Sequence, residues 1–164
     1  MTSATTNRLY AAARLILRDD ERAADAVQDA LLQAWLDLRG LRDPDRFDAW
    51  LHRLLIRACY KAARRQRRRE VLETRFANTA STTTGDAQLA VALHDELDRG
   101  FRRLSPQHRA AIVLHHYLGM SLAESAEVLG IPLGTMQSRL HRATHQMRAV
   151  LAAGEVELAG EAVR

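Results

Sequence analysis

Residues 121–143 read SLAESAEVLGIPLGTMQSRLHRA, and this stretch decides how the second half of the chain folds. Ser121 and Glu124 match a capping box, in which the two residues satisfy each other's free backbone amides at a helix start. Gly130 ends that short helix, and an Ile-Pro-Leu-Gly turn leads into a longer helix predicted over about 135–151. A short helix, a tight turn and a longer helix with Arg and His on its polar face form a helix-turn-helix pattern, which many unrelated helical pairs also share.

Two more helices are predicted before this motif. The first is amphipathic, with apolar side chains at spacings of four, four, four and three at Leu89, Leu93, Leu97, Phe101 and Leu104. Ser105 followed by Pro106 is a strong restart signal, because it places a capping hydroxyl before a proline in the first helical turn. The helix that begins there carries an apolar run towards Tyr117, and Gly119 closes it.

Three helices are predicted in the first half, and the first two cover 9–17 and about 21–38. The apolar face expected for the second helix is Val27, Leu31, Ala34, Trp35 and Leu38. Asp43 before Pro44 starts the third helix. Its expected apolar face is Phe47, Trp50, Leu51, Leu54 and Ala58. Beyond Lys61 this face disappears and the helix becomes rich in arginine.

Both halves therefore predict an all-α protein of two small helical domains joined by a flexible linker, with the helix-turn-helix in the second domain. The composition agrees, because the 164 residues include 28 alanines but only 8 glycines and 3 prolines. The polar stretch ANTASTTTGD at 77–86 has no apolar period and marks the linker. We place the first domain at 1–70, the linker at 71–88, the helix-turn-helix domain at 89–153 and a short acidic tail at 154–164.

The composition excludes several classes of protein. The single cysteine, Cys59, can form no internal disulfide, and its place beside an apolar helix face predicts a buried or half-buried thiol. Residues 1–8 lack the apolar run of a signal peptide, and the longest purely apolar stretch, 110–114, is far too short to cross a membrane. We therefore expect a cytoplasmic protein without membrane insertion.

The net charge of +4 conceals an uneven distribution. Residues 39–70 carry 11 basic and 4 acidic side chains, and residues 101–153 carry 6 and 2, whereas residues 1–38 carry 4 and 6. Clustered positive charge creates the field that attracts a polyanion, so two separate surfaces could bind nucleic acid. The alternative for the arginine run at 64–69 is a solvated helix end, since basic runs often only improve solubility.

Both halves closely resemble bacterial RNA polymerase sigma factors of the extracytoplasmic-function (ECF) type. Residues 130–143 are similar to the last helix-turn-helix of that family, with its Gly-Ile-Pro, Gly-Thr-Val, Ser-Arg-Leu and Arg-Ala elements. The matches to the family's promoter-melting domain are Ala23, Asp25, Val27, Gln28, Asp29 and Trp35, then Phe47, Trp50, Leu51, Arg53 and Arg64. Three positions depart from the family pattern: Ala24 replaces a glutamate, and Arg57 and Lys61 stand where Asn and Asp are usual.

This resemblance implies a specificity subunit, and not an enzyme, that binds core RNA polymerase, directs it to promoters and helps to open the duplex. It implies core RNA polymerase and promoter DNA as partners, an anti-sigma factor as the regulator, and no cofactor. The polymerase-binding face that it implies is the polar face of the second helix, at Asp25, Gln28, Asp29 and Gln33. Without the resemblance, these four residues would be interpreted as an ordinary solvated helix face.

The DNA contacts that the resemblance implies have the matching chemistry. Melted bases need stacking surfaces, worth about 1–3 kcal/mol per base, and cations that follow the strand. The set proposed for the melted −10 element is Trp50, His52, Arg53, Arg57, Lys61, Arg64 and Arg65. Trp50 also falls on the apolar face, so core packing is its alternative.

The last helix should enter the major groove, where Arg142 can pair with guanine and Gln137 with adenine. The full set proposed for this −35 contact is Thr135, Gln137, Ser138, Arg139, His141 and Arg142. On the opposite side of the helix, the side chains expected in the core are Leu133, Met136 and Leu140.

Two other functions fit parts of the sequence. A stand-alone helix-turn-helix regulator would use only residues 89–152 and would bind an operator without polymerase, whereas a protein-interaction module would dock its basic helix on an acidic partner. His141 and His145 are four apart on a helix and could share a metal ion. However, no cysteine or carboxylate lies within a helical turn as a further ligand, so no metal site is expected.

Overall fold

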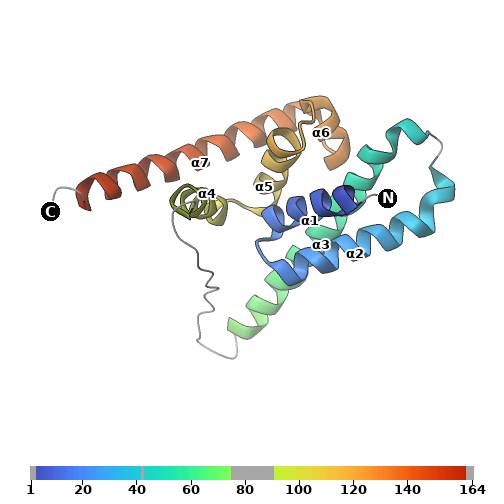
Figure 1. The fold of residues 1–164 in the computed structure, drawn as a ribbon, viewed down its shortest axis with the longest axis horizontal. Coiled ribbons are helices and arrows are strands. Elements are labelled where there is room, and N and C mark those ends of the chain that lie inside the picture. Colours follow the sequence, from blue (N-terminus) through green and yellow to red (C-terminus); the bar gives the residue numbers. More distant parts are fainter. Residues whose placement is uncertain (1–2, 42, 75–90, 162–164) are drawn as a thin grey trace.

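The structure, a computed structural model, describes residues 3–41, 43–74 and 91–161, and every regular element in these ranges is a helix. The first half comprises α1 (Ser3–Leu17), α2 (Asp20–Asp37), the 3-10 turns η1 (Leu38–Gly40) and η2 (Pro44–Arg46), and α3 (Phe47–Thr74) (Figure 1). The second half comprises α4 (Val91–Arg103), α5 (Pro106–Ile112), the π-helical turn η3 (Val113–Tyr117), α6 (Leu122–Leu129) and α7 (Leu133–Glu161). The all-α prediction is confirmed, whereas the predicted linker lies mostly outside the described residues, including its polar stretch at 77–86.

Helix ends follow the capping signals of the sequence. The Ser121 hydroxyl accepts the amide N–H of Glu124 at 3.2 Å, and the Glu124 carboxylate accepts that of Ser121 at 2.8 Å, which confirms the capping box. Ser105 and Asp19 cap α5 and α2 through their side-chain oxygens. Gly130 ends α6 in the left-handed conformation (φ 65°), which glycine adopts without a steric penalty.

Two helices extend further than the periodicity indicated. Helix α1 begins at Ser3 instead of near residue 9, and α7 continues to Glu161 instead of ending near residue 151. The apolar pattern is weak in both extensions, but both lack proline, and the α7 extension is rich in alanine, leucine and glutamate, which favour helix. An apolar period marks only the part of a helix that packs, and not the whole helix.

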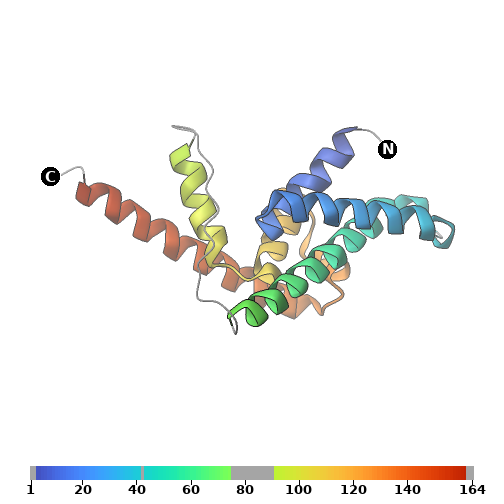
Figure 2. The same ribbon diagram turned by 90° about the horizontal axis from the view of Figure 1, so that it is seen from below.

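The largest buried cluster joins the two halves of the chain. Leu9 and Ile16 of α1 and Leu55 of α3 are fully buried in it together with Val113 and Leu114 of η3. Helix α1 packs against α5 and η3, while α3 packs against α5 and α6. Figures 1 and 2 show the helices of the second half lying against α1 and α3, so both halves share one core in this conformation.

A smaller core holds the helix-turn-helix together. Its buried members are Ala111, Ala126 and Met136, and Leu140 packs against them. Met136 and Leu140 were expected there, and the structure confirms both. Leu133 is 46% exposed, so the expectation that it is buried is wrong. As the first residue of α7, it precedes the turn of helix that packs on α5 and α6.

Helix α2 buries only part of the predicted face: Val27 and Ala34 are buried and Leu31 packs partly buried against the core, as expected. Its buried residues are Ala23, Ala26, Val27, Ala30 and Ala34. Trp35 is 74% exposed and Leu38 is 49% exposed, so the prediction that they belong to the core is wrong. The helix carries two apolar stripes at helical spacing, and the alanine stripe faces α1 and α3 because small side chains let helices approach closely. The larger side chains are therefore left on the surface.

Helix α3 packs against helices of both halves, and its predicted core face is confirmed. Leu51 and Leu54 are buried, and Phe47, Trp50 and Ala58 pack partly buried against the same cluster. Cys59 is fully buried, as predicted.

Candidate nucleic-acid and polymerase interfaces

The N-terminal half of α7 presents a polar face to solvent. Met136 at 0% exposure anchors this part of the helix on its smaller core. The exposed side chains are Thr135, Gln137, Ser138, His141 and Arg142. The Ser138 hydroxyl donates to the carbonyl oxygen of Thr135 at 3.0 Å, which fixes its direction. A helix held from behind with free donors and acceptors in front has the geometry that major-groove reading requires.

Arg139 differs from the rest of this set. It is only partly exposed and lies beside Tyr60 of α3. Burial raises the pKa of the Tyr60 hydroxyl to about 12, and the nearby positive charge of Arg139 acts in the opposite direction. Of the six residues proposed for the −35 contact, five face solvent and one faces the first half of the protein.

An exposed basic stripe runs along α3. Arg57, Lys61, Arg64 and Arg65 are exposed, and the first three lie at spacings of four and three. Lys61 Nζ lies 3.6 Å from the Asp29 carboxylate of α2, a solvent-exposed pair that contributes little to stability. The stripe can therefore contact a polyanion without the cost of burying its charges.

The other three residues of the predicted −10 set make contacts within the protein. The Trp50 ring packs partly buried against the large core, with its centroid 5.8 Å from that of Phe47. His52 is partly buried, and its Nδ1 lies 2.6 Å from the Asp48 carbonyl oxygen. Burial lowers the pKa of His52 below its ordinary 6.5, although the bond to Asp48 opposes that shift, so the ring is neutral at pH 7. Arg53 turns towards α6.

The four residues of the predicted polymerase face are exposed on α2, but only three of them line hollows, and these are two different hollows. Asp25 and Asp29 line an open cleft of about 410 Å³ between α2 and α3, where Lys61 and Arg65 form the opposite wall. Gln28 lines a hollow of about 590 Å³ between α1 and α2, whose other walls are largely apolar. The structure thus brings acidic and basic residues that the sequence assigned to different partners into one cleft. Gln33 lines neither hollow and donates to Asp37.

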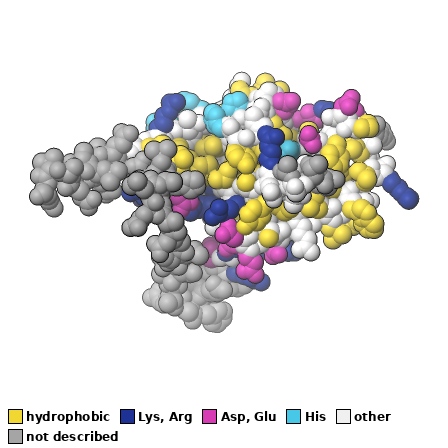
Figure 3. Space-filling view, viewed as in Figure 1, with side chains coloured by type: hydrophobic (Ala, Val, Ile, Leu, Met, Phe, Trp, Pro, Cys, Tyr) yellow, Lys and Arg dark blue, Asp and Glu magenta, His cyan; other side chains and the backbone are white. Residues whose placement is uncertain are grey.

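An exposed apolar stripe on α2 was missed by the sequence reasoning. Leu32, Trp35 and Leu36 are 56%, 74% and 58% exposed, and they lie next to the apolar hollow that Leu32 helps to line. Figure 3 shows apolar side chains gathered over the α1 and α2 end of the molecule. An exposed apolar stripe of this kind is a candidate docking surface. The sequence did contain a signal for this surface, namely the second apolar stripe on α2. A helix that packs on the core through one stripe leaves the other stripe exposed.

The described residues contain neither a candidate metal site nor a candidate membrane-spanning helix. In that part of the chain, no group of three or more His, Cys, Asp or Glu side chains is placed to hold a metal ion. No helix there is long and apolar enough to span a membrane.

Comparisons with known proteins match each half of the chain to a protein family. The model of the family "Sigma-70 region 2" matches residues 2–69, and that of "Sigma-70, region 4" matches residues 94–147. The chain is 32% identical over 144 residues to the ECF RNA polymerase sigma factor SigM of Mycobacterium tuberculosis. The alignment covers 88% of this chain and 71% of the relative.

Two solved structures share the fold over most of their length. The sigma factor RpoE from Bartonella quintana, crystallised with the anti-sigma factor NepR, gives a TM-score of 0.74 at 28% identity, covering 91% of this chain and 92% of that one. CnrH, in complex with the cytosolic domain of CnrY, gives 0.61 at 29% identity, covering 89% and 81%.

A basic helical domain followed by a helix-turn-helix domain, each matched by a sigma-70 region in that order, defines a transcription initiation factor of the sigma class. The protein belongs to the family of ECF RNA polymerase sigma factors. The resemblance found in the sequence is thereby confirmed.

Proposed function

We propose that the protein is a cytoplasmic specificity subunit that binds core RNA polymerase, directs it to promoters and helps to initiate transcription. The observation that carries this proposal is the exposed polar face of α7, held by its own small core, in a chain that also presents an exposed basic stripe on α3. The protein performs no chemical step itself, because the polymerase supplies the catalytic centre.

The −35 element is read by α7. Arg142 pairs with a guanine and Gln137 with an adenine, since their side chains can each make two hydrogen bonds to those base edges. Ser138 and His141 flank them on the same exposed face. Thr135 and Arg139 contact phosphates, which orient the helix without reading sequence.

The melted −10 strand is held by α3. Arg57, Lys61, Arg64 and Arg65 follow the phosphates, and their exposure on one side of the helix supports this role. Trp50 and His52 border the strand near the start of the stripe, where the neutral ring of His52 can stack on a base. Arg53 lies at the same end of α3 and completes the set proposed for the −10 element.

Core RNA polymerase docks on α2. The exposed apolar stripe at Leu32, Trp35 and Leu36 forms the centre of the docking surface, and the predicted face at Asp25, Gln28, Asp29 and Gln33 forms its polar rim. Aromatic anchors surrounded by polar residues are typical of such interfaces. The partner surface on the polymerase is therefore apolar at its centre and basic at its edge.

An anti-sigma factor regulates the protein. Two similar solved structures each hold a partner: the sigma factor RpoE was crystallised with the anti-sigma factor NepR, and CnrH is in complex with the cytosolic domain of CnrY. The RpoE structure covers 91% of this chain. A polypeptide of that kind would fit the exposed α2 surface and the basic stripe of α3.

Run-off transcription tests the function. Purified protein with core polymerase on genomic fragments should produce transcripts from defined start sites, and Arg142→Ala should abolish or relax recognition of the −35 element while core binding persists. Arg148→Ala is the control, because Arg148 is exposed on α7 but lies beyond the last residue of the set proposed to contact the −35 element. Failure to form any complex with core polymerase would refute the function, and specific operator binding without polymerase would favour a stand-alone regulator.

A further inference from the structure

We propose that the cleft between α2 and α3 is a binding site for a nucleoside polyphosphate, whose phosphates occupy its basic end and whose sugar hydroxyls face its acidic wall. The cleft holds about 410 Å³, which lies within the range of pockets that bind small organic molecules. Three of its lining residues are alanines, Ala26, Ala58 and Ala62. Because these side chains are short, they leave the hollow open between the longer polar side chains around it.

Basic side chains from both helices gather at one end of the cleft. Helices α2 and α3 follow each other in the chain and run antiparallel, so the start of α2 lies beside the end of α3 (Figure 1). The arginines that line the cleft come from the first turn of α2 and the second half of α3, and they are Arg22, Arg65, Arg68 and Arg69. Guanidinium groups match phosphate geometry through paired hydrogen bonds. This end of the cleft therefore suits a ligand with several phosphates.

Three of these four arginines have no anionic partner in the described part of the chain. Arg65, Arg68 and Arg69 make no ion pair or side-chain hydrogen bond there, whereas Arg22 Nε lies 3.3 Å from the Asp19 carboxylate. Like charges that converge without a partner repel one another, so an anion that enters between them is stabilised.

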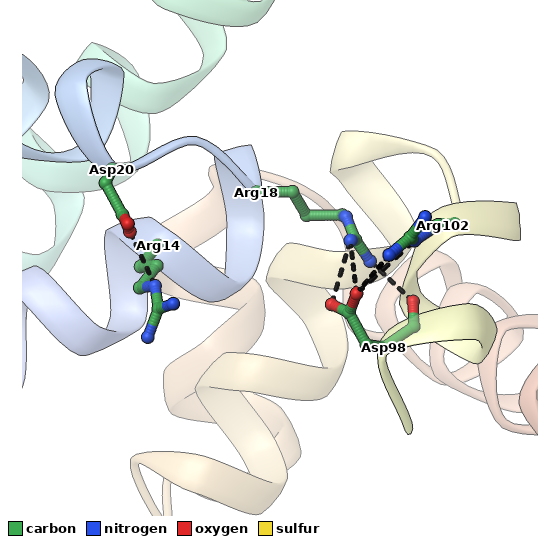
Figure 4. A network of polar contacts seen from close by, with 5 residues as sticks. All are labelled: Arg14, Arg18, Asp20, Asp98 and Arg102. Carbon is green, nitrogen blue, oxygen red and sulfur yellow. Dashed lines mark hydrogen bonds and ion pairs between the residues drawn. The ribbon is translucent and has the colours of Figure 1, made fainter. Parts of the chain in front are cut away.

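The arginines that precede α2 are different, because they already have partners (Figure 4). Arg14 Nε lies 2.6 Å from the Asp20 carboxylate. Arg18 and Arg102 share the Asp98 carboxylate, each at 2.8 Å. The protein thus neutralises one group of arginines internally and leaves the group in the cleft available to an external anion.

The acidic wall gives the cleft a direction. Asp25 and Asp29 lie one turn apart on α2, and Asp29 lies 3.6 Å from Lys61 Nζ. Asp25 has no ion pair within the described residues. A carboxylate repels phosphate but accepts hydrogen bonds from hydroxyl groups, as acidic residues do for ribose in nucleotide sites. A nucleoside polyphosphate matches both parts of the cleft, whereas inorganic polyphosphate matches only the basic end.

A bound nucleotide would compete with the promoter. Lys61 and Arg65 line the cleft and are also assigned above to the melted −10 strand, so this consequence rests on the proposed function. Arg68, in contrast, lines the cleft and has no assigned promoter contact. It therefore allows the nucleotide site to be tested separately from the strand.

Calorimetric titration of the full chain with ATP, GTP and inorganic tripolyphosphate, without polymerase or metal ions, tests the site. We expect saturable binding of at least one nucleotide. Arg68→Gln should weaken it about tenfold, because a charge-assisted hydrogen bond contributes roughly that factor. Arg67→Gln is the matched control, since Arg67 is the adjacent exposed arginine and does not line the cleft. It should bind the nucleotide as tightly as wild type.

Asp25→Ala tests the direction of the ligand. Loss of a hydroxyl acceptor should weaken nucleotide binding about threefold or more, whereas loss of a negative charge should leave tripolyphosphate binding equal or tighter. Equal weakening by Arg67→Gln and Arg68→Gln would overturn the proposal, as would tighter binding of both ligands to Asp25→Ala. Either result would indicate only general attraction to a basic surface. Absence of saturable binding of both nucleotides would overturn it directly.

A competition measurement separates this site from the proposed function. ATP or GTP, whichever binds, should displace a short fluorescent DNA single strand from wild type and from Arg67→Gln, and about tenfold more nucleotide should be needed with Arg68→Gln. Equal displacement from the two variants would overturn the proposal. If no variant binds the strand, the assignment of α3 to the −10 element fails, and the calorimetry still decides the nucleotide site.

Discussion

Replacing Leu114 with alanine should destabilise the first half of the protein, although Leu114 belongs to the second. Its side chain is 0% exposed and lies in η3, which packs against α1 within the shared core. Truncating a fully buried leucine leaves a cavity and costs about 2–5 kcal/mol of the free energy of unfolding, and we take about 3 kcal/mol here. With a urea m-value of about 2 kcal/mol per molar, the unfolding midpoint falls by about 1.5 M.

Intrinsic fluorescence makes this test selective. The two tryptophans of the chain, Trp35 and Trp50, both lie in the first half, so their emission follows the unfolding of that half alone. Far-UV circular dichroism follows all helices. If the shared core couples the halves, both signals shift together in Leu114→Ala. Leu133→Ala, a leucine truncation at a 46% exposed site, should move neither signal measurably.

The reasoning would be refuted by a separation of the two signals. If the tryptophan midpoint of Leu114→Ala equals that of wild type while circular dichroism shows an additional early transition, the halves unfold independently. The packing of α1 against η3 would then contribute no measurable stability.

Three further outcomes are expected. The lowered pKa of His52 means that the unfolded chain binds a proton more readily, so the free energy of unfolding should decrease as pH falls below 6.5, and His52→Gln should flatten that decrease in urea titrations at pH 7.5 and 5.5. With a pKa of about 12, roughly one Cys59 thiol in ten thousand is ionised at pH 8, so iodoacetamide should modify it only after unfolding, and rapid labelling of the native protein would contradict its burial. Trp35→Ala should weaken core-polymerase binding roughly tenfold or more without loss of stability, whereas Val71→Ala, at a 56% exposed site on α3, should change neither.

Much of the fold could be predicted from local sequence because its signals are local. The capping box at Ser121, the restart at Ser105 and the buried Met136 each follow from a few neighbouring residues. The orientation of α2 could not be predicted from local sequence. Periodicity gives the spacing of apolar residues, but it does not tell which of two stripes faces the core. Ala30 is buried and Trp35 exposed for reasons of packing that depend on α1 and α3.

The candidate site shows the same limit. The exposure of Gln137 and Arg142 on α7 follows from helical geometry, and the sequence predicted it. No local pattern reveals that Glu127 reaches Arg53, 74 residues earlier in the chain. The shared cleft of Asp25 and Lys61 likewise arises only when α2 and α3 pack together. Contacts between distant segments depend on how the helices are placed, and not on the residues of either segment alone.

The shared core also has a consequence during protein synthesis. The faces of α1 and α3 that pack against the second half are complete once Thr74 has been made, but their cover is complete only with α6, which ends at Leu129. At about 5–20 residues per second, the ribosome leaves this apolar surface open for about 3–11 s. During that interval the nascent chain exposes an apolar surface to which chaperones and neighbouring chains can bind. Translational pauses in this stretch would lengthen the exposure and lower the yield of folded protein.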